Sequence, residues 1–263
     1  VSIQRCPVTD YRPLADLPHL NNLALAHARL GQHEEAVQHY RQAVKVYKAV
    51  RADALDHERG NPDASGPLGD ALQISVFKEQ SKAHGGLVRS LVALGHATAA
   101  LLAAEDGRSV ALKKLLDVED TEGNWGVAEL LALATEPEVN ADLVYYHHDT
   151  ADKKLWTWVV PRAGGLDDIH FVEQENIGED DIPQIVSAMD KATVATVAMR
   201  AHQGSHGAAA VAVAADLSRL YELLIAPIAD KLSPDGRVVF FPHGNFVLTP
   251  FSALRCSAEG QAP

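Results

Sequence analysis

The sequence has few cysteines, no long apolar stretch and a shortage of positive charge, and each shortage excludes a class of protein. Its two cysteines, Cys6 and Cys256, lie at opposite ends of the chain, so they do not form the framework of a disulfide-rich domain. The longest apolar run, residues 208–215, is far shorter than the ~18 to 20 residues that span a bilayer. We expect no membrane span and, because no secretory signal is recognisable, a reducing cytoplasmic location.

The charge balance argues against a general affinity for nucleic acid or for anionic membranes. The chain carries 23 basic and 35 acidic residues, which gives a formal net charge of −12. Residues 117–181 alone hold 17 acidic and 3 basic residues, so the rest of the chain has a net charge of +2. This uneven distribution favours a boundary between two parts of the chain.

The first third of the chain has the pattern of a helical hairpin. Small and apolar residues recur at helical spacing over residues 20–30, and Gly31 is placed to end that helix. A second helical run over residues 34–44 brings three residues to one face: Ala36, Tyr40 and Ala43. The pattern predicts two antiparallel helices joined at Gly31.

This hairpin resembles a tetratricopeptide repeat, because the string LxNLAxAxxxLGxxxEAxxxYxxA matches one unit over residues 20–43. A weaker copy lies 64 residues further on, where Leu94-Gly95 corresponds to Leu30-Gly31. An array of this kind needs about three repeats for stability. The resemblance therefore implies the end of a longer array that binds a protein or peptide partner.

The segment between the two copies contains several helix breakers. Glycines and prolines over residues 60–67 predict an exposed loop, which we assign to an insertion over residues 51–73. A further helical run, residues 97–116, follows the second copy. We assign residues 1–96 to a tetratricopeptide-like region, and residues 97–125 to a connecting helix and an acidic linker.

The second half of the chain begins with the pattern of a β-sheet. Residues 142–146 and 154–160 are rich in β-branched and aromatic side chains, and polar residues separate them. They predict a β-hairpin with a solvated turn, and a third short strand is expected over residues 169–173.

Helices and one more strand are expected after this hairpin. The helices are placed over residues 180–201 and 208–232, the second with a kink at Pro227. The run over residues 237–241 is apolar without alternation, which is typical of a strand buried on both faces.

The order of these elements, together with two motifs, resembles the CHAT family, a group of caspase-like proteins related to HetF and separase. The motifs are LYELLxxPI over residues 220–228 and PHGxxxxxPFxAL over residues 242–254. The resemblance implies an α+β multidomain chain, in which tetratricopeptide-like hairpins precede the N-terminal half of an α/β caspase-like CHAT domain. We assign residues 126–263 to that incomplete domain.

The resemblance also implies an intact protein that acts as a cysteine endopeptidase regulated by its repeats. Its catalytic His and Cys belong to later HxxxHG and SAC motifs, and neither string follows Leu254. We therefore assign no catalytic, cofactor-binding or metal-binding residue and expect this fragment to be inactive. The alternative function is a non-catalytic adaptor, in which the α/β part is a pseudo-protease scaffold.

Two other arrangements imitate functional sites. His243 and Cys256 suggest a Cys-His dyad, but the 13 residues between them leave no room for the crossover helix that joins parallel strands. Four residues of the predicted hairpin turn suggest a metal site: His147, His148, Asp149 and Asp152. Adjacent strand residues point to opposite faces, so a solvated turn is the favoured interpretation.

Two pairs of side chains suggest binding surfaces. Trp156 and Trp158 share one strand face, where they either line a pocket or pack against helices, and packing is the commoner use. Asn21 and Asn22 lie on the first repeat helix, where they could contact a peptide in the concave groove. Asn22 matches a structural position of the repeat, so a structural role is favoured there.

Overall fold

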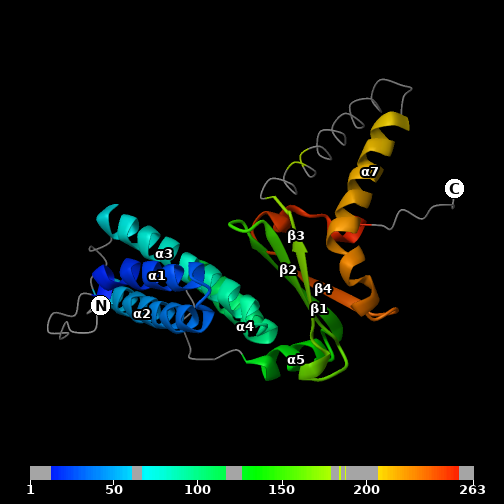
Figure 1. The fold of residues 1–263 in the computed structure, drawn as a ribbon. Coiled ribbons are helices and arrows are strands. Elements are labelled where there is room, and N and C mark those ends of the chain that lie inside the picture. The colour runs from blue at the N-terminus through cyan, green and yellow to red at the C-terminus, as the bar shows by residue number, and fades with distance from the viewer. Residues whose placement is uncertain are drawn as a thin grey trace. The chain divides into compact units, whose positions relative to one another are not determined.

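The computed structural model describes most of the chain, in four ranges and two single residues: 13–60, 67–116, 126–178, 207–254, Gln184 and Ser187. The chain divides into two compact units, Val1–Trp125 and Gly126–Pro263. The first unit is helical, and the second is built around a four-stranded sheet (Figure 1). Among the described residues, no helix has the length and apolar character needed to cross a membrane.

Four helices make up the described part of the first unit: α1 (Pro13–Arg29), α2 (His33–Gly60), α3 (Pro67–Ala93) and α4 (Ala97–Leu116). α1 packs on α2, α2 on α3, α3 on α4, and α1 also packs on α3. The helices thus form two hairpins that stack on one another (Figure 1).

The prediction of an exposed loop over residues 51–73 is wrong for most of that range. α2 continues to Gly60 and α3 begins at Pro67, and the six positions between them lie outside the described residues. Gly60 and Pro67 sit where a helix tolerates them, because glycine is compatible with a helix end and proline with a first helical turn.

Both hairpins turn at the same point of the 64-residue repeat. Gly31 and Gly95 have φ angles of +74° and +75°, which is left-handed backbone that favours glycine. After each glycine, the next amide donates a hydrogen bond of 2.9 Å to a carbonyl five residues earlier, on His27 and Leu91 respectively. The turn predicted at Gly31 is confirmed, and the second hairpin repeats its geometry.

Four strands form the sheet of the second unit: β1 (Ala141–Asp149), β2 (Lys154–Val160), β3 (His170–Glu175) and β4 (Arg237–Phe241). Their order is β3-β2-β1-β4, with β1 antiparallel to β2, β2 antiparallel to β3, and β1 parallel to β4. The predicted hairpin and third strand are confirmed.

Two α-helices and four 3₁₀ turns accompany this sheet in the described residues: α5 (Val127–Thr135), η2 (Leu166–Asp168), α7 (Gly207–Leu224), η3 (Ala226–Lys231), η4 (Gly244–Leu248) and η5 (Phe251–Ala253). The kink expected at Pro227 is instead the end of the α-helix. α7 stops at Leu224, and Pro227 lies in the first turn of η3, where the missing amide costs no helical hydrogen bond. The helix expected over residues 180–201 falls almost wholly outside the described residues.

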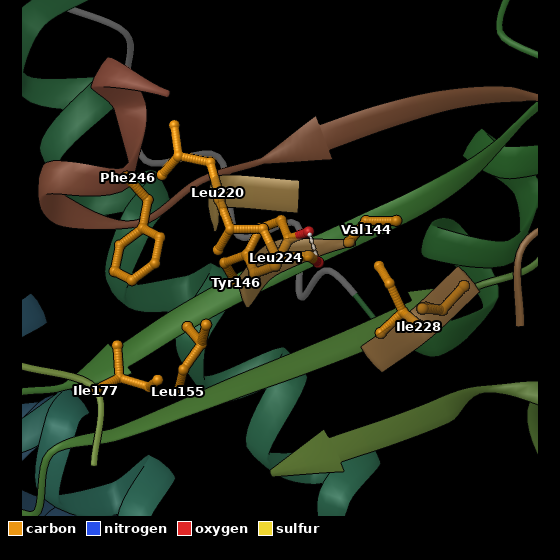
Figure 2. Close-up of a cluster of buried hydrophobic side chains, with 9 residues drawn as sticks. Val144, Tyr146, Leu155, Ile177, Leu220, Leu224, Ile228 and Phe246 are labelled. Atoms are coloured by element: carbon orange, nitrogen blue, oxygen red, sulfur yellow. Dashed lines mark hydrogen bonds between the residues drawn. The ribbon is translucent and has the colours of Figure 1, made fainter. Parts of the chain in front are cut away.

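One face of the sheet carries the core of the second unit. Tyr146 is completely buried there, and its hydroxyl donates a 2.8 Å hydrogen bond to the carbonyl of Leu224 at the end of α7 (Figure 2). The cluster has nine members: Val144, Tyr146, Leu155, Val159, Ile177, Leu220, Leu224, Ile228 and Phe246. Strands, α7, η3 and η4 are therefore joined by apolar burial.

The last strand departs from the expectation of full burial. Arg237 is exposed, and the four apolar residues that follow it are only half-buried. In the described part of the sheet, β4 pairs with β1 alone, so its apolar run belongs to an edge strand.

Candidate functional site

A row of polar and aromatic side chains crosses all four strands at one end of the sheet. His243 follows β4, and its ring stacks on that of His147 in β1 with a centroid distance of 4.4 Å. His147 in turn stacks on Trp156 of β2 at 5.7 Å. The indole N–H of Trp156 donates a 2.7 Å hydrogen bond to Glu173 of β3.

This row lies at the carboxyl ends of the parallel strands β1 and β4. Ligands of α/β sheets commonly bind at such ends, so the position is where a site would be sought. His147 and Trp156 are almost completely buried, with 9% and 1% of their surfaces exposed. The stacked rings therefore link β1 to β2 and to the turn that follows β4.

Glu173 has two partners in this row. Its other carboxylate oxygen accepts a 2.7 Å hydrogen bond from the ammonium of Lys154. Burial by itself would raise the pKa of Glu173, but the hydrogen bonds from Lys154 and Trp156 outweigh it and lower that pKa. The carboxylate is thus held ionised, and it fixes the orientation of the indole.

The structure separates the four residues considered as metal ligands. His147 stacks on Trp156, whereas His148 points to the other face, where its Nε2 donates a 2.9 Å hydrogen bond to the carbonyl of Ile177. Within the described ranges, no group of three or more His, Cys, Asp or Glu side chains is arranged to hold a metal ion.

The interpretation of these residues as a solvated turn is wrong for three of them. β1 continues through Asp149, and His147, His148 and Asp149 are all buried. The hydrogen bond to the carbonyl of Ile177 offsets the cost of burying the His148 ring, which also meets the ring of Phe246 edge-on at 5.4 Å.

Both tryptophans are packed, and the partners that the structure shows belong to neighbouring strands rather than to the expected helices. Trp158 is fully buried and lies against Phe171 of β3 at a centroid distance of 5.3 Å. Trp156 is held by His147 and Glu173. Cys256, the other member of the Cys-His pair considered from the sequence, lies outside the described residues.

Asp142 is a buried carboxylate that holds three segments of the second unit together. It is fully buried at the start of β1. It accepts hydrogen bonds from the backbone amides of Arg162 at 2.9 Å and Ser233 at 2.6 Å, and from the Ser233 hydroxyl at 3.0 Å. These bonds satisfy both carboxylate oxygens, so Asp142 has a structural role.

In the helical unit, Asn21 has clear structural contacts, and Asn22 is exposed. Asn21 is buried, and its amide nitrogen donates to the hydroxyl of Tyr47 at 3.2 Å. The same nitrogen donates to the carbonyl of Glu79 at 3.1 Å and approaches its carboxylate at 3.3 Å. Asn21 therefore fastens α1 to both α2 and α3, and Asn22 remains on the surface.

Asp106 of α4 is the centre of a charge network that the sequence patterns missed. Its carboxylate accepts hydrogen bonds from Lys48 of α2 at 2.7 Å and from His84 of α3 at 3.2 Å. Burial would raise the pKa of Asp106, but these hydrogen bonds and charges lower it to about 2. No local motif could reveal this network, because each helix contributes one member.

Comparison with known proteins supports the assignment of the first hairpin. A tetratricopeptide repeat family matches residues 19–53, which include most of α1 and the first part of α2. No curated protein and no solved structure matches the chain. The chain thus contains a tetratricopeptide repeat in its helical unit.

Proposed function

We propose that this chain binds a protein partner through its helical hairpins, and that its sheet unit is a CHAT-like domain that serves as a scaffold. The observation that carries the first part is the repeat match over residues 19–53, together with matching turn geometry at Gly31 and Gly95. Tetratricopeptide hairpins generally mediate protein–protein interaction. Stacked hairpins offer a partner an extended surface of exposed helix faces.

The packing of the two CHAT-like motifs supports the second part. The motif over residues 220–228 ends α7 and enters η3, and three of its apolar side chains lie in the core: Leu220, Leu224 and Ile228. In the other motif, Gly244 has a φ angle of +57° and Phe246 is buried. These motif residues therefore hold an α/β unit together, which is the role expected of a scaffold.

A second candidate is that the intact protein is a caspase-like cysteine endopeptidase. The feature that favours it is the parallel pair β1 and β4, with His147 and His243 at the carboxyl ends where α/β enzymes commonly place their sites. Both histidines lie in the ring stack, so the adaptor is the better supported function for this chain.

The proposed function is tested by selecting peptides from an unbiased display library on the full-length chain. We expect a family of related peptides that bind the chain but not the Gly86→Val variant, because a side chain there collides with the Tyr40 ring between α2 and α3. The control is Val247→Ser, which changes an exposed residue of the sheet unit. Absence of selective peptides, or equal loss in both variants, would overturn the proposal.

A further inference from the structure

One side of α3 is left uncovered by the other helices. Four residues at helical spacing define this α3 stripe: Lys78, Lys82, Gly85 and Arg89. Lys78 and Lys82 are exposed, and Gly85 and Arg89 are half-buried. Most of the other residues between Glu79 and Leu91 are buried, and α3 packs on α1, α2 and α4.

The internal repeat shows what kind of element fits the α3 stripe. In the 64-residue repeat, Gly85 of α3 is equivalent to Asn21 of α1. Asn21 lies on the side of α1 that packs against α3, where it donates a hydrogen bond to Glu79. The α3 stripe is therefore equivalent to the side of α1 on which α3 packs.

Gly85 has no side chain, and the space beside it is unfilled. A Cβ atom built there meets nothing within 4 Å, so no packing contact among the described residues requires glycine. The neighbouring Gly86 differs, since a Cβ there would lie 2.2 Å from the Tyr40 ring. Glycine weakens a helix interior, and a close approach of another chain is one of the reasons to keep it.

The charge of the α3 stripe indicates the chemistry of its occupant. Two exposed lysines of the stripe, Lys78 and Lys82, stand where α1 has the uncharged residues Leu14 and Pro18. Glu79, which lies beside these lysines, accepts a 2.5 Å hydrogen bond from Lys82, and this bond lowers its pKa. An occupant of the stripe therefore meets excess positive charge, which favours acidic side chains.

We infer that the α3 stripe docks an acidic amphipathic helix of a protein partner, packed along α3 as α3 packs along α1. Acidic side chains of that helix pair with Lys78 and Lys82, and a large apolar side chain fills the open space at Gly85. The inference rests on the proposed function and specifies the partner segment that the hairpins bind.

The test uses the full-length chain and a fluorescein-labelled synthetic peptide of 18 residues. The probe is an amphipathic helix with glutamates along both edges of a leucine face, and its counterpart carries lysine in place of every glutamate. Fluorescence anisotropy should show binding of the acidic helix that weakens with salt, and at least about ten-fold weaker binding of the basic helix.

Three variants locate the site. Gly85→Leu fills the open space with a good helix former, so circular dichroism should be unchanged while affinity falls at least about ten-fold. The double variant Lys78→Glu, Lys82→Glu should abolish binding. The matched control is Lys45→Glu, an exposed position of α2 outside the stripe, which should bind as the parent chain does.

The outcomes separate this inference from the proposed function. Equal binding of the acidic and basic helices, or equal effects of Gly85→Leu and Lys45→Glu, would overturn the inference. Library-selected peptides that lose binding to Gly86→Val but bind Gly85→Leu as they bind the parent chain would overturn the inference and leave the proposed function standing. Failure of every peptide in both assays would overturn both.

Discussion

The imidazole rings of His147 and His243 stack at a centroid distance of 4.4 Å, and they join the end of β1 to the turn that follows β4. The backbone amide of His148 donates a 3.4 Å hydrogen bond to Nδ1 of His243. The regular ladder between these strands ends at the pair Tyr145 and Phe241. The histidine side chain thus extends the pairing of β1 and β4 beyond the last backbone pair.

The His243 contact predicts a change in hydrogen exchange at one amide. In His243→Ala, the His148 amide loses its acceptor and should exchange with solvent faster than in the parent chain. His243→Asn, whose side-chain oxygen can accept the bond, should restore part of the protection. Unchanged exchange at His148 in His243→Ala would show that the contact does not hold the strand end.

The charge network of Asp106 predicts a pH dependence of stability. Because the folded-state pKa of about 2 lies below the unfolded value of 3.8, this carboxylate stabilises the fold above pH ~4, and its contribution is lost as the pH falls towards 2. The side chain is 37% exposed, so solvent screening reduces the contribution to about 1 kcal/mol.

The contribution of Asp106 is measured as the difference in stability between the parent chain and the Asp106→Asn variant. Urea denaturation should show Asp106→Asn to be less stable than the parent chain at pH 7, with the gap closing between pH 4 and pH 2. The difference removes the background of the other carboxylates, which titrate in both proteins. A gap that stays constant over this range would contradict the assigned role of Asp106.

The adjacent glycines of α3 should respond to alanine in opposite directions. At Gly86 the added Cβ would lie 2.2 Å from Cζ of Tyr40, so Gly86→Ala should lower the free energy of unfolding by about 1 to 3 kcal/mol. At Gly85 the space is open, and Gly85→Ala should raise the free energy of unfolding by up to about 1 kcal/mol. Thermal unfolding of both variants gives the comparison, and equal shifts would contradict the packing of Tyr40.

Features with a local sequence signal were predicted well. Gly31 ends a helical run, and the structure gives it a positive φ angle. Strands 154–160 and 237–241 were placed because β-branched and aromatic residues cluster there, and they coincide with β2 and β4. In these cases, the residues that determine the conformation are neighbours in the sequence.

Features that depend on distant partners were missed. The polar residues His147 to Asp149 suggested a turn, because their polarity is local while the rings that bury them come from β2 and from the segment after β4. The apolar run of β4 was expected to be buried on both faces, but it is only half-buried, at the edge of the described sheet.

The buried carboxylate of Asp142 predicts a large effect of a small change. Asp142→Asn keeps the shape but turns an acceptor into a donor that faces the Arg162 or Ser233 amide, so stability should fall by about 2 to 4 kcal/mol. Asp235→Asn, at an exposed position of the same unit, is the matched control and should have little effect. Equal stability of the two variants would contradict the anchoring role.

The proposed scaffold role predicts that the purified chain does not cleave peptide bonds. No HxxxHG or SAC string follows Leu254, and the His243 ring is stacked on His147. Incubation with a diverse peptide library, followed by mass spectrometry, should show no cleavage above that of a buffer control. Because trace proteases can produce false positives, any cleavage is compared with that of a Cys256→Ser preparation purified in parallel. Turnover that disappears in Cys256→Ser would overturn the scaffold role and make this chain a peptidase.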